Sequence, residues 1–144
     1  MNNLKYMCLL MALVSVMTIG FTSCSSDDND DTPAPFVKLE EANIEGDELC
    51  VEANIVAQGR ISSIVINVCN PSGSNVKVAY PVMGNKYIGV LNIEDFHVHV
   101  DIAEKNVSMG DLLTLTVTDA NGRSTTAKKS ITEEEDQDDN YNQK

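Results

Sequence analysis

The chain has no tryptophan, and aromatic residues make up only 5% of its 144 residues. Carbohydrate-binding sites use aromatic rings as platforms, so a glycan ligand ranks below a protein partner. A small domain must bury its large apolar side chains, and we therefore expect Phe36 and Phe96 in the core. Tyr80 and Tyr87, on either side of residues 81–86, would form either a small exposed patch or the rim of the core.

Basic residues are also scarce, with ten Lys and Arg against 22 Asp and Glu and a net charge of −12. Nucleic-acid binding needs a basic surface that displaces counterions from phosphates, so it is not expected here. Ten of the acids lie outside residues 36–131, and that central segment carries twelve acids against eight bases. Its length suits one small domain with a single core.

The common catalytic motifs are missing as well. We find no Gly-x-Ser-x-Gly, Cys-x-x-Cys, phosphate-binding glycine loop or His-Glu-x-x-His. The chain has two histidines, His97 and His99, so a histidine base for hydrolysis could come from nowhere else. Neighbouring acids such as Glu40-Glu41 and Glu94-Asp95 are expected to be solvated in turns. The sequence therefore predicts a protein that is not an enzyme.

No apolar run reaches the roughly 20 residues that a membrane-spanning helix needs. Fifteen mostly apolar residues from Met7 to Phe21 follow Lys5, which is typical of a secretory signal. This run ends in Phe21-Thr22-Ser23-Cys24, which resembles the lipobox of bacterial lipoproteins. The resemblance implies that residues 1–23 are a signal peptide and that Cys24 is lipidated and anchors the protein to a membrane. The alternative is an ordinary signal peptide that ends by chance near a cysteine.

The next residues resemble the serine-plus-acidic signal that directs Bacteroidota lipoproteins to the outer face of the outer membrane. The resemblance implies a surface-exposed protein, and the residues concerned are Ser25, Ser26, Asp27, Asp28, Asp30 and Asp31. The same composition predicts an extended acidic tether over residues 24–35. Residues 132–144 have no apolar run and are predicted to be a disordered acidic tail.

Between these ends, apolar and polar residues alternate in short runs that are separated by turn residues. Such alternation predicts strands, and we count seven or eight. Their spacing favours an all-β fold, an antiparallel β-sandwich of the immunoglobulin-like or fibronectin-type-III-like kind, over residues 36–131. The expected strands are Phe36 to Glu40, Leu49 to Ala57, Ile61 to Cys69, Val76 to Val82, Lys86 to Ile93, Phe96 to Ile102, Leu113 to Val117 and Arg123 to Ile131.

The segment FHVHVDIAEKNVSMGDLLTLTVTDANGRST, residues 96–125, resembles a family of uncharacterised Bacteroidota lipoprotein domains. That family has a similar His-x-His strand, a Gly-Asp pair before a later strand, and Thr-Asp-x-x-Gly. The resemblance implies an immunoglobulin-like fold and the same location. It implies no activity, because the family has none assigned.

Two cysteines remain in the expected domain, Cys50 and Cys69. A hairpin that turns at Gly59-Arg60 would place them opposite each other, where a closely spaced pair could form a disulfide without strain. In an immunoglobulin-like topology, however, the second and third strands belong to different sheets, and the two cysteines would be unlinked thiols that face outward on opposite sides. The sequence leaves both arrangements open.

The two histidines alternate with apolar residues and are expected on the outward face of one strand, with Asp101 next in line. Two imidazoles and a carboxylate could share a divalent ion such as zinc or nickel, bound weakly. The alternative is an ordinary solvated face of a half-buried strand.

The sequence therefore predicts a lipid-anchored, surface-exposed and non-catalytic immunoglobulin-like module for adhesion, accessory binding or assembly. No resident cofactor is expected. The alternative function is a metal-binding lipoprotein that uses His97 and His99.

Overall fold

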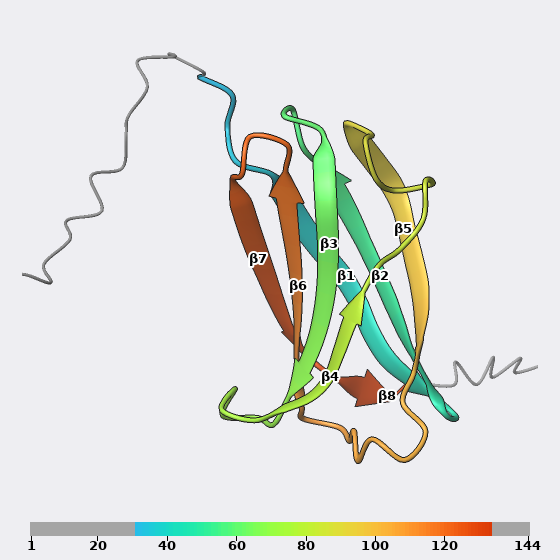
Figure 1. Cartoon of the computed structure of the whole chain (residues 1–144). Coiled ribbons are helices and arrows are strands. Elements are labelled where there is room, and N and C mark those ends of the chain that lie inside the picture. The colour runs from blue at the N-terminus through green and yellow to red at the C-terminus, as the bar shows by residue number, and fades with distance from the viewer. Residues whose placement is uncertain (1–30, 134–144) are drawn as a thin grey trace, which may run out of the picture. The chain divides into compact units, whose positions relative to one another are not determined.

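The computed structural model describes residues 31–133, in which every regular element is a β-strand (Figure 1). No helix in this range is long and apolar enough to cross a membrane. The predicted signal peptide, Cys24, the export residues from Ser25 to Asp30 and the tail after Glu133 lie outside the described residues. The strands are β1 (Phe36–Glu45), β2 (Glu48–Val56), β3 (Ile61–Cys69), β4 (Val76–Pro81), β5 (Asn92–Asp101), β6 (Leu112–Asp119), β7 (Ser124–Ser130) and β8 (Thr132–Glu133).

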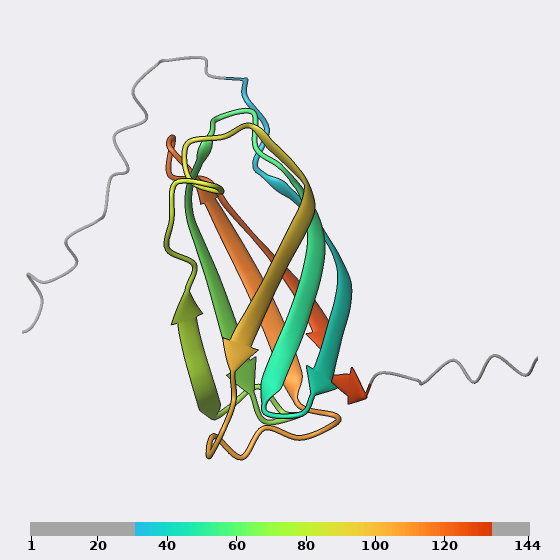
Figure 2. The ribbon, with the colours of Figure 1, turned by 90° about the vertical axis from the view of Figure 1, so that its right-hand side faces the viewer.

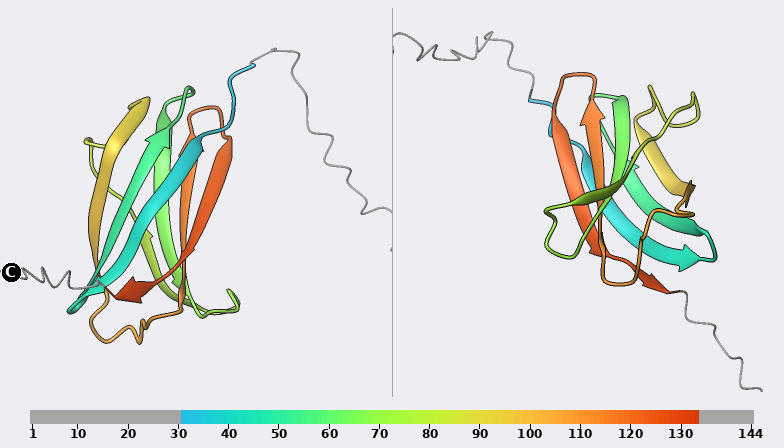
Figure 3. Two further views of the ribbon diagram at one scale, coloured as in Figure 1. Left: turned by 180° about the vertical axis from the view of Figure 1, so that it is seen from behind. Right: turned by 60° about the horizontal axis from the view of Figure 1, so that its bottom comes forward.

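The strands form two four-stranded sheets, with the orders β5-β2-β1-β8 and β4-β3-β6-β7. All neighbours are antiparallel except β1 and β8, which run parallel. Figures 2 and 3 show the two sheets as two layers that face each other. The predicted all-β sandwich is therefore confirmed.

Period-two alternation accounts for the core between the sheets. Inward positions of β2, β3 and β6 are almost completely buried, while most of their outward neighbours are polar. Phe96, Val100 and Ile102 are buried as predicted, and the side chains of both sheets join in one apolar cluster. Phe36 differs from the prediction, because it occupies an outward position at the start of β1 and is 63% exposed.

Three strand boundaries also differ from the prediction. β1 continues to Glu45, where Gly46 supplies the positive φ of 62° that the first residue of a two-residue hairpin loop can require. Residues 86–91, predicted as part of a strand, form turns that lead from the second sheet to the first, with Gly89 at a φ of 85°. Thr132–Glu133, predicted to begin the tail, pair with β1 as β8.

The hairpin between β2 and β3 was the wrong alternative. Both edges of each strand are occupied by other strands, β1 and β5 for β2, and β4 and β6 for β3. The Gly59-Arg60 turn instead carries the chain from one sheet to the other, and a Cβ on Gly59 would lie 2.6 Å from the Asp119 carboxylate. Cys50 and Cys69 therefore belong to different sheets and are free thiols, which rules out the proposed disulfide.

Candidate metal centre

Strand pairing brings Cys50 and both histidines together on the outer face of the first sheet. In the register of β2 with β5, Cys50 lies opposite His99, and Glu52 lies opposite His97. Inward side chains alternate with these residues on both strands, so the four polar side chains share one face. The sequence predicted this face for the histidines, and the structure adds a sulfur atom beneath them.

The donor atoms of Cys50, His97 and His99 lie within 4.8 Å of one another. Cys50 Sγ is 3.9 Å from His97 Nε2, and the two Nε2 atoms are 2.7 Å apart. The imidazole rings are tilted by 52° with their centroids 4.7 Å apart. These three residues form the candidate metal-ligand cluster that we find in the described part of the chain, and we call it the Cys-His-His cluster.

A carboxylate contacts the other nitrogen of each ring. His97 Nδ1 is 2.8 Å from Glu52 Oε1, and His99 Nδ1 is 3.2 Å from Glu48 Oε2. An ionised carboxylate only accepts hydrogen bonds, so His97 Nδ1 donates to Glu52, and the Nε2 atom of each ring is the one that remains for another partner. Carboxylate-histidine pairs of this kind orient the imidazoles of metal sites and raise their basicity.

The thiol of Cys50 is protected from solvent although it is on the outer face. Its residue is 3% exposed and its sulfur lies within 4.8 Å of a nitrogen of each imidazole, whereas the histidine side chains are 46% and 39% exposed. Burial, together with the nearby carboxylates of Glu45 and Glu52, raises the pKa of the Cys50 thiol to about 12. The thiol is therefore protonated at neutral pH, and a bound cation would displace that proton.

Strand β5 is fixed in place by the residue that precedes the first histidine. Phe96 is buried in the core, and its ring centroid is 5.0 Å from that of Tyr87. The Tyr87 hydroxyl donates a hydrogen bond to the backbone carbonyl of His97 at 3.0 Å. Tyr87 is 8% exposed and Tyr80 packs against the core, so these tyrosines belong to the rim of the core and form no exposed aromatic patch.

Asp101 does not join the histidines, although the sequence predicted it as the third ligand. Its carboxylate accepts a hydrogen bond from the Ala103 N–H at 2.9 Å, which closes the turn after β5. The residue that joins the histidines is Cys50. Sequence reasoning missed it because the contact depends on the pairing of β2 with β5. Cys50 and His97 are 47 positions apart in the chain.

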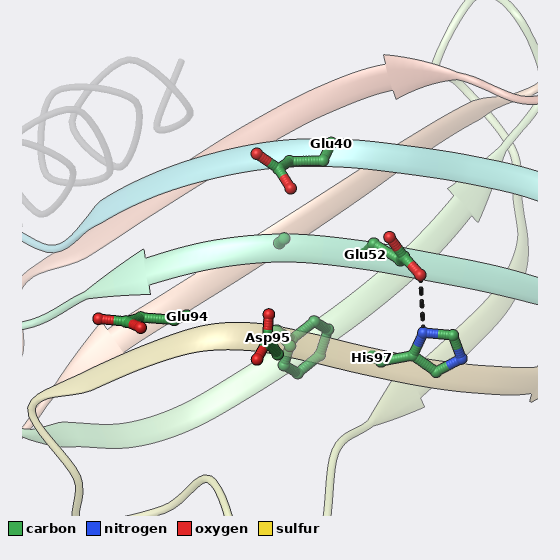
Figure 4. Close-up of a pocket in the computed structure, with 7 residues that line it drawn as sticks. Glu40, Glu52, Glu94, Asp95 and His97 are labelled. Carbon is green, nitrogen blue, oxygen red and sulfur yellow. Dashed lines mark hydrogen bonds and ion pairs between the residues drawn. The ribbon is translucent and has the colours of Figure 1, made fainter.

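An acidic pocket of about 90 Å³ adjoins His97 (Figure 4). Its carboxylates come from β1, β2 and β5, and they are Glu40, Glu52, Glu94 and Asp95. The Lys38 ammonium hydrogen-bonds Glu40 and holds the pKa of that carboxyl below its usual value. A concentration of negative charge beside the cluster attracts cations to it.

The raised pKa of Cys50 predicts a pH-dependent stability for the metal-free protein. The folded chain holds the thiol proton more tightly than the unfolded chain, so this contribution is complete below pH 9 and is lost as the pH rises towards 12. We expect the unfolding free energy of the wild type to fall relative to Cys50→Ala by up to about 1.4 kcal/mol per pH unit in that window. Urea unfolding of both proteins at several pH values measures this, and a constant difference would contradict it.

No known protein family matches the chain, and no curated protein matches it either. Among solved structures, OgpA from Akkermansia muciniphila is similar, with a TM-score of 0.52 and 16% sequence identity over 68% of this chain. The chain spans 27% of the length of that protein. At 16% identity, the similarity shows only that the two proteins share an all-β fold.

Proposed function

We propose that this domain binds a transition-metal ion at the Cys-His-His cluster. The observation that supports the proposal is the convergence of Cys50 Sγ with the Nε2 atoms of His97 and His99, while Glu48 and Glu52 hold the opposite nitrogens. Thiolate and imidazole are the donors that zinc, copper and nickel prefer, and carboxylates are common outer-shell partners of such sites.

The close contact of the two Nε2 atoms indicates how a cation would enter. At 2.7 Å they can form a hydrogen bond only if a proton lies between them. A zinc ion with bonds of 2.0–2.1 Å and tetrahedral angles holds two nitrogens roughly 3.3 Å apart. The two nitrogens must therefore separate by roughly 0.6 Å to admit the cation between them, which half-exposed side chains can do.

The cluster supplies three protein donors and leaves one side open to solvent. This number corresponds to a metal site with an open coordination position, in contrast to the four protein ligands of a structural zinc site. A thiolate also adds a negative charge that the two predicted imidazoles lack. We therefore expect tighter binding than the two histidines would give alone.

Replacing the thiol tests the proposal with a matched control. Cys50→Ser is expected to lower the zinc affinity roughly 10- to 100-fold, because a hydroxyl is a poor substitute for a thiolate ligand. Cys69→Ser, in the other sheet, is expected to leave it unchanged. Calorimetric titration of the purified protein with zinc chloride measures both. Two variants with equal affinities, or a wild type that binds neither zinc nor copper, would refute the proposal.

We also propose that the sandwich is of the immunoglobulin-like type. In that topology strands A, B and E share one sheet, and C, F and G share the other. β1, β2 and β5 correspond to the first set and β3, β6 and β7 to the second, with β4 as an additional strand beside β3. This strand order supports the proposal.

Lipid anchoring through Cys24, display on the outer membrane and a role in adhesion, accessory binding or assembly are further proposals. They rest on the resemblances of residues 21–31 and on the lack of catalytic motifs. The binding of a metal ion is compatible with each of them.

A further inference from the structure

We infer that the ion for which the Cys-His-His cluster is built is copper, and that the cluster stabilises Cu(II) bound to the Cys50 thiolate. This inference rests on the proposed function and makes it specific. It follows from the number of donors, from the isolation of the sulfur atom and from the charge of the surrounding face.

The donor set has one thiolate and two imidazoles, and three of the neighbouring carboxylates contact other groups. Glu52 and Glu48 contact the Nδ1 atoms of the histidines, and Asp101 binds the Ala103 N–H. A trigonal set of two histidines and one cysteine is characteristic of electron-transfer copper sites. Structural zinc would require a fourth protein donor, which the described residues do not add to the cluster.

The isolation of Cys50 matters because an ordinary thiolate reduces Cu(II). The sulfur gives one electron to the ion, which becomes Cu(I), and two of the resulting thiyl radicals couple to form a disulfide. Coupling requires a second sulfur atom, but Cys69, the other cysteine of residues 31–133, lies in the opposite sheet, and both thiols are buried. Cys50 is only 3% exposed, which hinders coupling to the sulfur of another molecule as well. The Cu(II)-thiolate bond can therefore persist.

The surrounding charge favours the higher oxidation state. Glu41 and Glu45 of β1 lie on the same outer face as Cys50, beside the two carboxylates that hold the imidazoles. Negative charge stabilises Cu(II) more than Cu(I), whereas the soft sulfur ligand favours Cu(I). Both states are thus accessible. The half-exposed imidazole edges allow a small one-electron donor to reach the ion.

The test uses the full chain with Cys8→Ser, Cys24→Ser and Cys69→Ser, so that Cys50 is the remaining thiol. One equivalent of Cu(II) is added without oxygen. We expect a thiolate-to-copper charge-transfer band in the visible spectrum and an electron paramagnetic resonance signal that accounts for the added copper. Ascorbate should supply one electron and bleach the band, and ferricyanide should remove that electron and restore it.

Two further measurements separate the possible outcomes. Cys50→Ser in the same background should lose the band but keep a Cu(II) signal from the imidazoles, and about a tenfold excess of zinc should not bleach the band of the parent. Loss of the Cu(II) signal on mixing, together with a disulfide-linked dimer, would overturn the inference. So would a parent protein that binds zinc but shows no band, in which case the proposed function still stands. If neither ion binds, the proposed function itself fails.

Discussion

Replacing both His97 and His99 with alanine is expected to lower the zinc affinity by more than about 100-fold. Loss of an outer-shell partner of a metal ligand typically costs 10- to 100-fold, and this variant loses two of the three proposed ligands themselves. Both side chains lie on the exposed face of β5. The metal-free variant should therefore unfold within about 0.5 kcal/mol of the wild type, as for most surface substitutions.

Two controls identify the source of this effect. The double variant Glu48→Gln/Glu52→Gln keeps every ligand but removes the charge that orients the imidazoles, and we expect its affinity to fall by about 10- to 100-fold. Asp101→Ala should bind zinc as the wild type does, because its carboxylate contacts the backbone after β5. Zinc titrations of all three variants measure these effects. A loss of affinity in Asp101→Ala equal to that in the histidine variant would contradict the assignment of the ligands.

Phe96→Ala is expected to lower the unfolding free energy by about 3–5 kcal/mol, the usual cost of removing a buried aromatic ring. Phe96 is 1% exposed, packs against Tyr87 and lies opposite Ala53 in the pairing of β5 with β2. Domains of this size are stable by only about 5–15 kcal/mol, so the variant should be close to unfolding at physiological temperature. Its zinc affinity should fall too, because β5 carries two of the ligands.

The same substitution at Phe36 provides the control. Phe36 is 63% exposed, so Phe36→Ala should change the unfolding free energy by about 0.5 kcal/mol or less. Urea unfolding of both variants without metal measures the difference. Equal losses at the two positions would mean that the end of β1 is part of the core, against the burial described above.

Much of the fold could be predicted because alternation is a local property of the chain. The runs around Leu49, Ile64, Phe96 and Leu115 each show which side of a strand is apolar, and the structure buries those sides. The same alternation predicted the outward position of His97. Local patterns failed where the chain changes sheet: the apolar residues of 86–91 suggested a strand, but Gly89 and the crossing between sheets impose turns.

The metal cluster could be predicted only in part, because its third member depends on pairing between distant strands. The pattern around His97 and His99 is contained in one strand, so the sequence revealed it. Cys50 joins them through the register of β2 with β5, which no local pattern specifies. The equal spacing of Cys50 and Cys69 about Gly59-Arg60 was compatible with a hairpin as well as with strands in different sheets. The structure excludes the hairpin, because β1 and β5 pair with both edges of β2, and β4 and β6 pair with both edges of β3.

The alternation of β5 assigns folding stability and surface chemistry to different residues of one strand. Phe96 and Val100 face the core and contribute to stability. His97 and His99, which lie between them in the sequence, face outward and are not part of the core. Mutation can therefore change the ligands, or remove them, at little cost to folding. A sheet face of this kind allows one scaffold to acquire, exchange or lose a metal-binding activity during evolution while its core sequence stays under the same selection.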